Sequence, residues 1–153
     1  MRVMDHETWV QTQFSNCRLG DPRRSKRLCQ VASTMLNAPE QSLPQQNPQW
    51  SDLKAAYRFF GTPKVTLRAV SDPHWQQTRQ TRPGRYLLIS DTTDIDQKTR
   101  PSTKGMGMLG NGQGRGLQLH TSLMYDSNEK QIVGTAWALG QDRKRVPKNE
   151  KSA

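Results

Sequence analysis

Hydrophobic spacing divides the chain near Pro83 and Gly84, because helical periodicity precedes these residues and strand-like runs follow them. Four helices are predicted, over residues 7–16, 22–37, 50–60 and 66–78. Three strands are predicted, over residues 85–91, 117–125 and 131–139. The pattern indicates an α+β protein with a helical domain over residues 1–83 and a sheet-bearing domain over residues 84–153.

The second and fourth predicted helices have recognisable starts. Asp21 supplies a side-chain N-cap, and Pro22 takes the first helical position, where its missing N–H is not needed. The apolar stripe of this helix consists of Leu28, Val31, Ala32, Met35 and Leu36. Thr66 caps the fourth helix, in which Pro73 is expected to bend or restart the chain.

The third predicted helix has an aromatic-rich stripe, and Gly61 ends it. The stripe is made up of Trp50, Leu53, Ala56, Tyr57 and Phe60. Aromatic side chains at this spacing are usually core residues, so we expect burial, with stacking on nucleic-acid bases as the alternative. Lys54 and Arg58 lie on the opposite face of the same helix.

The first predicted strand is apolar over residues 86–90 without alternation, which is typical of a central strand covered on both faces. Asp91 ends this strand, where its carboxylate can either bind a metal ion or cap a turn. The second strand alternates apolar and polar residues, and residues 126–130 supply a hairpin turn to the third. The glycine-rich segment 105–110 matches a dinucleotide-binding pattern, but a strand rather than a helix follows it, so a flexible loop is predicted.

Composition argues against a membrane-spanning, secreted, disulfide-stabilised or zinc-binding protein. Only 32% of the 153 residues are hydrophobic, and no apolar run approaches the ~20 residues that cross a bilayer. The N-terminal residues also lack the apolar core of a signal peptide, so a cytoplasmic protein is expected. Cys17 and Cys29 show neither disulfide-framework nor zinc-site spacing and are predicted to be free thiols.

Charge points to a polyanionic partner. The net charge is +10 with a pI of about 10.1, and both predicted domains are basic. Four cations, Arg23, Arg24, Lys26 and Arg27, crowd the start of the second helix, where positive charge opposes the helix dipole. This cluster, with Lys54 and Arg58, is the leading candidate for contacts to DNA phosphates, and an ordinary solvated surface is the alternative.

Several motifs together carry a family resemblance. They are Leu19-Gly20-Asp21-x-Arg23, Lys26-Arg27-Leu28, Lys54-Ala55-Ala56-Tyr57-Arg58-Phe59-Phe60, Asp91-Thr92-Thr93-x-Ile95-Asp96 and Gly114-Arg115-Gly116-Leu117-x-Leu119-His120. With them the chain resembles, over about residues 9–152, the N-terminal part of bacterial insertion-sequence transposases of the IS-four, transposon-Five type. The resemblance implies a four-helix module that binds double-stranded DNA at transposon terminal repeats, followed by the first three strands of a ribonuclease-H-like sheet.

The resemblance also implies a catalytic role for one residue. In that family an Asp, Asp, Glu triad holds Mg²⁺ for two-metal DNA cleavage and strand transfer, and Asp91 matches the first triad carboxylate and metal ligand. The other two carboxylates lie in later elements, and residues 147–152 resemble the run that precedes them. Asp94, Asp96 and Asp126 are interpreted as loop and turn residues. We therefore expect an incomplete sheet from a truncated or split gene, whose product alone is inactive.

Two other functions stay open on the sequence. A non-catalytic regulator can occupy transposon ends without chemistry, and the absence of the two later carboxylates favours this alternative. A basic RNA-binding protein is the third hypothesis. We expect a bacterial, nucleoid-associated protein that can form homo-oligomers, with neither a membrane nor a small-molecule substrate as its partner.

Overall fold

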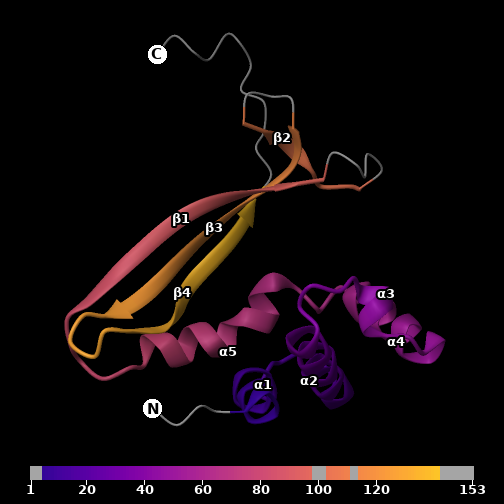
Figure 1. The fold of residues 1–153 in the computed structure, drawn as a ribbon, viewed down its shortest axis with the longest axis horizontal. Coiled ribbons are helices and arrows are strands. Elements are labelled where there is room, and N and C mark those ends of the chain that lie inside the picture. The colour runs from indigo at the N-terminus through magenta and orange to yellow at the C-terminus, as the bar shows by residue number, and fades with distance from the viewer. Residues whose placement is uncertain (1–4, 98–102, 111–113, 142–153) are drawn as a thin grey trace. The chain divides into compact units, whose positions relative to one another are not determined.

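The structure is a computed structural model that describes residues 5–97, 103–110 and 114–141. The chain divides into two compact units, Met1–Gln77 and Thr78–Ala153. The first unit is built from helices and the second around a sheet (Figure 1). The last helix ends at Arg79 and the first strand begins at Tyr86, so Pro83 and Gly84 lie between the two kinds of structure.

The described residues contain five helices. They are α1 (His6–Phe14), α2 (Pro22–Asn37), α3 (Leu43–Gln46), α4 (Trp50–Phe60) and α5 (Leu67–Arg79). Four of them correspond to the predicted helices. The additional helix, α3, is a single turn in the predicted connector, where Ser42 and Gln45 form a capping box.

Local capping explains where the helices begin and end. The Asp21 carboxylate accepts a hydrogen bond of 2.8 Å from the backbone N–H of Arg23, which confirms the predicted start of α2. The Thr66 hydroxyl accepts a hydrogen bond of 3.1 Å from the backbone N–H of Ala69 at the start of α5. Pro73 was predicted to bend or restart the helix; α5 continues through this residue as one helix, so it does not restart there.

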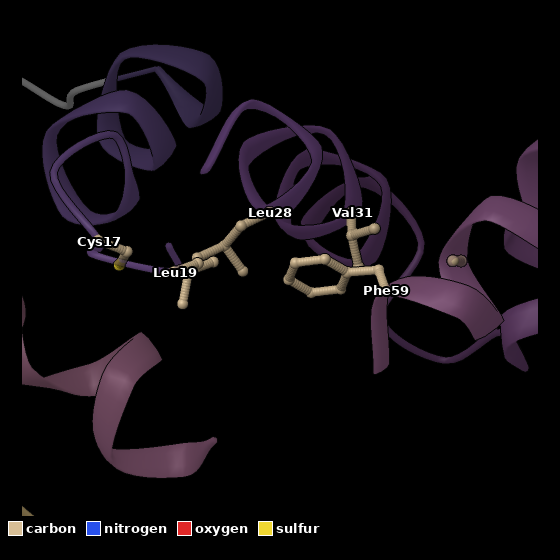
Figure 2. Packing of buried hydrophobic residues seen from close by; sticks show 6 residues of the cluster. Cys17, Leu19, Leu28, Val31 and Phe59 are labelled. Atoms are coloured by element: carbon tan, nitrogen blue, oxygen red, sulfur yellow. The ribbon is translucent and has the colours of Figure 1, made fainter. Parts of the chain in front are cut away.

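The core of the helical unit joins α2, α4 and the segment between α1 and α2. Its buried residues are Cys17, Leu19, Leu28, Val31, Ala56 and Phe59. Figure 2 shows the Phe59 ring pointing from α4 toward Leu28 and Val31 of α2. The predicted stripe on α2 is therefore buried in its first half, whereas Met35, one turn further on, is 38% exposed.

The buried face of α4 differs from the predicted one. Ala56 and Phe59 are buried, but Trp50 is 69% exposed, Tyr57 is 53% exposed and Phe60 is 46% exposed. The prediction of burial was wrong for these three aromatic residues. Large apolar side chains occur on several sides of α4, so periodicity alone does not select one face, and packing against α2 places Phe59 inside.

The described residues of the second unit form a four-stranded antiparallel sheet, with one strand more than predicted. Its strands are β1 (Tyr86–Asp96), β2 (Gly107–Leu109), β3 (Gly114–Asp126) and β4 (Gln131–Gln141). β3 is central, with β1 along one edge and β4 and the short β2 along the other (Figure 1). β2 lies in the segment that was predicted to be a loop.

The turn between β3 and β4 forms where it was predicted. The Asp126 carboxylate accepts hydrogen bonds from the backbone N–H groups of Asn128 and Glu129, at 2.9 and 3.2 Å. Arg82 forms ion pairs of 2.7 Å with Glu129 and 3.8 Å with Asp126. Asp126 is therefore a turn residue, as interpreted from the sequence, and Arg82 stabilises the same turn.

The position of β1 contradicts the prediction of a central, covered strand. Within the described residues β1 pairs with β3 alone, so it is an edge strand. Leu87, Leu88 and Ile89 are 52%, 64% and 53% exposed. Since β1 extends to Asp96, Asp91 also lies inside the strand instead of ending it.

Strand alternation gives the sheet two chemically different faces. One face is largely apolar; among its residues are Leu87, Ile89, Leu123, Tyr125 and Ile132, in register across three strands. On the other face polar side chains bond across β1 and β3. The Ser90 hydroxyl donates to the Ser122 hydroxyl at 3.0 Å, and the Gln118 amide donates to the Asp94 carboxylate at 3.0 Å.

Candidate nucleic-acid interface

The first cationic surface lies on α2. Leu28 and Val31 face the core, and the exposed residues Arg23, Lys26 and Gln30 lie on the opposite side of the helix, which we name the α2 solvent face. The side chain of Arg23 is 94% exposed. Within the described part of the chain no carboxylate lies in ion-pair distance of Lys26. The α2 solvent face therefore presents cationic side chains that can reach an external anion.

The other two arginines of the predicted cluster have partners inside the protein. Arg24 donates a hydrogen bond of 2.8 Å from Nη1 to the carbonyl oxygen of Leu19. Arg27 Nη1 lies 4.0 Å from a carboxylate oxygen of Asp52 and so connects α2 to α4. Arg24 and Arg27 thus contact other segments of the helical unit, whereas Arg23 contacts only the neighbouring N-cap residue Asp21, at 3.9 Å, and is otherwise directed at solvent with Lys26.

These contacts explain how α2 tolerates positive charge at its N-terminus. The Asp21 carboxylate caps the helix, and one of its oxygens lies 3.9 Å from Nε of Arg23. Negative charge near a helix N-terminus is favourable, so Asp21 offsets part of the unfavourable interaction between the arginines and the helix dipole. The cluster is therefore compatible with a stable helix while Lys26 remains available to a ligand.

Lys64 lies near this cluster in the structure, and no motif or spacing in the sequence indicates this position. The backbone of Gly20 has a φ of 78°, and a Cβ atom there would lie 2.8 Å from Cδ of Lys64, 3.1 Å from its Nζ and 3.3 Å from Nη1 of Arg24. Lys64 precedes α5 and is far from Gly20 in the sequence. Folding therefore brings a further cation beside Arg24, and glycine leaves the space that both side chains need.

The second cationic surface lies on α4. Lys54 and Arg58 are exposed, and they lie on the side of the helix opposite the buried residues Ala56 and Phe59. Asp52, which is exposed and pairs with Arg27 of α2, lies on the same side of α4 as Ala56 and Phe59. Lys54 and Arg58 therefore point away from α2, and the structure does not join them to the α2 solvent face.

A groove with many polar residues in its lining lies between α1 and α2. Its lining includes Gln11 from α1 and Lys26, Gln30, Thr34 and Asn37 from α2. At the far end, a ring nitrogen of His6 lies 3.2 Å from the side-chain oxygen of Asn37. Lys26, which belongs to the α2 solvent face, thus also lines this groove.

The titratable groups inside the helical unit are structural. Burial raises the pKa of the Cys17 thiol to about 11, and this thiol donates to the carbonyl oxygen of Val70 at 3.2 Å. Burial also raises the pKa of Cys29, and both cysteines are free, as predicted. His74 has its pKa lowered by burial, and its ring lies 2.5 Å from the side-chain oxygen of Gln13. Protonated thiols and a neutral imidazole are suited to a core.

Asp91 lies in the middle of β1, where it faces Thr121 of β3 across the ladder. Its exposed carboxylate accepts a hydrogen bond of 3.3 Å from the Thr93 hydroxyl. Asp94 and Asp96 are strand residues rather than the predicted loop residues, and alternation places them on the other face of β1. Among the described residues, no three His, Cys, Asp or Glu side chains are grouped so that they could hold a metal ion.

Comparison with known families bears on the helical unit. Residues 6–65 match a family model described as transposase DNA-binding. The matched range contains α1 to α4, both cationic surfaces and Lys64. The helical unit is therefore similar to the DNA-binding segment of transposases, in agreement with the resemblance found in the sequence. In the part of the chain that the structure describes, no helix has both the length and the apolarity to span a membrane.

Proposed function

We propose that this chain binds double-stranded DNA through the α2 solvent face, as the DNA-binding segment of an insertion-sequence transposase of the IS-four, transposon-Five type. The observation that carries the proposal is the exposure of Arg23 and Lys26 on the free side of α2, inside the range that matches transposase DNA-binding segments. Phosphates attract such side chains whatever the base sequence. Terminal repeats of a transposon are the proposed duplex.

Salt dependence tests this interface. Each cation that neutralises a phosphate contributes about 0.9 to the slope of log K against log salt, because bound counterions are released. An Arg23→Ser/Lys26→Ser variant of the full chain should flatten the slope by about two units on a 25-base-pair duplex. The matched control, Lys104→Ser/Lys130→Asn, removes the same charge from the second unit and should change the slope less.

We further expect the four cations at the start of α2 to differ in their contributions to stability and to DNA affinity. Arg24→Ser and Arg27→Ser should each lower thermal stability as well as affinity, because these side chains contact Leu19 and Asp52. Arg23→Ser and Lys26→Ser should leave stability nearly unchanged. An unchanged salt slope in the Arg23→Ser/Lys26→Ser variant would remove the α2 solvent face from the interface.

By resemblance, we further propose that Asp91 is the first carboxylate of a triad that binds Mg²⁺. Asp91 is exposed on β1, so its carboxylate is accessible to a cation. The described residues do not complete a metal site around it, so no cleavage step is derived from them. Two-metal chemistry needs several carboxylates, and Asp91 alone provides one.

The alternative function is a regulator that occupies transposon ends without cutting them. It is favoured by the lack, among the described residues, of any group of three His, Cys, Asp or Glu side chains that could hold a metal ion. We expect the purified chain to leave supercoiled plasmid intact in Mg²⁺ or Mn²⁺. Nicking that Asp91→Ala abolishes would support catalysis and remove the regulator hypothesis.

A further inference from the structure

Two large aromatic side chains on α4 face solvent beside two cations. Trp50, Lys54 and Tyr57 follow one another at positions i, i+4 and i+7, and Arg58 lies next to them. Trp50 is 69% exposed and Tyr57 is 53% exposed. We name these four residues the α4 solvent face.

Packing within the helical unit does not require the rings of Trp50 and Tyr57. Phe59 already packs between α4 and α2 (Figure 2). Phe60 makes an edge-to-face contact with Phe59, with ring centroids 5.4 Å apart. In the described residues no other ring packs against Trp50 or Tyr57. These two aromatic residues are therefore available to a ligand.

The composition of the α4 solvent face matches one class of ligand. Single-stranded nucleic acids stack their bases on exposed aromatic rings while lysine and arginine pair with their phosphates. A duplex keeps its base faces stacked on one another and does not offer them. An apolar protein surface would cover the rings, but it would also remove Lys54 and Arg58 from water without a counter-charge.

The two exposed surfaces differ in this respect. The α2 solvent face has cations and an amide but no aromatic residue, which suits the phosphate backbone of a duplex. The α4 solvent face alternates cations with aromatic rings. Because Asp52 on the other side of α4 pairs with Arg27, the α4 solvent face is directed away from α2.

From these observations we propose that the α4 solvent face binds unpaired bases of single-stranded DNA. Trp50 and Tyr57 stack on bases, and Lys54 and Arg58 contact the adjoining phosphates. This site is separate from the duplex-binding surface proposed on α2. A chain with both sites can hold a duplex and an unpaired segment of DNA at once.

Binding of a labelled 15-nucleotide oligothymidine to the full chain, followed by fluorescence anisotropy, tests the proposal. Trp50→Leu/Tyr57→Leu keeps apolar volume and helix propensity but removes both rings. We expect at least about a tenfold loss of affinity for the oligothymidine, because two rings are removed and each stacked base contributes roughly five- to 150-fold. Affinity for a 15-base-pair duplex should change less than about twofold, because phosphate contacts on α2 remain.

Three controls separate stacking from folding and from charge. Tyr57→Phe retains the ring and should keep oligothymidine affinity. Arg23→Ser/Lys26→Ser should lose duplex affinity and keep most of the oligothymidine affinity. Circular dichroism melts identify any variant that unfolds, and for such a variant Tyr57→Leu alone provides the comparison.

Several outcomes would overturn the proposal. One is an unchanged oligothymidine affinity in Trp50→Leu/Tyr57→Leu. Equal loss of oligothymidine and duplex affinity would instead indicate a single shared interface. Loss of self-association with oligothymidine affinity retained would identify the α4 solvent face as a protein contact. Failure of duplex binding with intact oligothymidine binding would overturn the proposed function on α2 and leave this site standing.

Discussion

Among the described residues, most of the buried hydrophobic side chains belong to the helical unit and few belong to the sheet unit. In the helical unit Leu19, Leu28 and Phe59 are 1%, 5% and 4% exposed. In the sheet, Leu88 of β1 and Ile132 of β4 are 64% and 63% exposed. The difference follows from geometry, since a few helices can turn their apolar stripes toward one another, whereas a single sheet has two faces and cannot cover either by itself.

Buried residues stabilise the fold, whereas exposed residues are available to bind a partner. In the helical unit the exposed residues include cations and the aromatic rings of Trp50 and Tyr57, on surfaces that a polyanion can approach. In the sheet unit the exposed residues include the aliphatic side chains of Leu88 and Ile132, and β1 also has an open edge within the described residues. An exposed edge with aliphatic side chains favours pairing with another strand.

The largest effect that we expect is a difference in stability between a core and a strand substitution. Phe59→Ala should destabilise the helical unit by about 3–5 kcal/mol, because it leaves a cavity between α4 and α2. Leu88→Ala, in an exposed side chain, should change stability by less than about 0.5 kcal/mol. Urea titrations followed by circular dichroism measure both, and equal losses would contradict the comparison.

A second expected effect is on self-association. Residues 1–83 alone should be soluble, monomeric and cooperative in unfolding, whereas the full chain should form oligomers through the exposed strand. Leu88→Lys should shift the full chain toward monomer, because a charge on an edge strand opposes pairing. Leu67→Lys, which alters an exposed leucine of α5, is the control. Size-exclusion chromatography measures the oligomeric state of each protein. A monomeric full chain would show that the edge of β1 does not pair with another chain.

The third effect concerns the cap of α2. Asp21→Ala removes the acceptor for the Arg23 N–H and the carboxylate nearest the arginines, so the helical unit should lose about 1 kcal/mol. Asp21→Ser retains a capping oxygen without the charge and should lose less. Thermal melts at low and high salt distinguish the two contributions. No difference between the variants would mean that the charge of Asp21 is unimportant.

The smallest effect is a pH dependence that arises from His74. Burial lowers its pKa in the folded chain below the value of 6.5 expected when it is exposed, so the unfolded chain binds a proton first as the pH falls. Stability is therefore fully present above pH 6.5 and declines below it, toward the lowered pKa. His74→Gln should reduce this decline in melts between pH 8 and pH 5. A decline of the same size in the variant would assign it to other groups.

Features that depend on neighbouring residues alone could be predicted from the sequence. The start of α2 at Pro22 depends on Asp21, and the turn after β3 depends on Asp126, which bonds to N–H groups two and three residues ahead. The free cysteines and the basic character of the chain also needed no structure. For the same reason the cationic residues of α2 and α4 could be recognised as candidates for DNA contacts.

The tertiary structure decided which of the equivalent-looking residues point outward. On α4, Phe59 is inside while Trp50 and Tyr57 are outside, because the position of α2 selects the buried face. Lys64 lies beside Arg24 only because the chain folds back over Gly20. The strand that was predicted to be central is an edge strand within the described residues, because strand order depends on which other strands are available to pair with it. Capping and turn bonds span a few residues, whereas burial and strand order depend on residues far apart in the chain, so only the folded protein determines them.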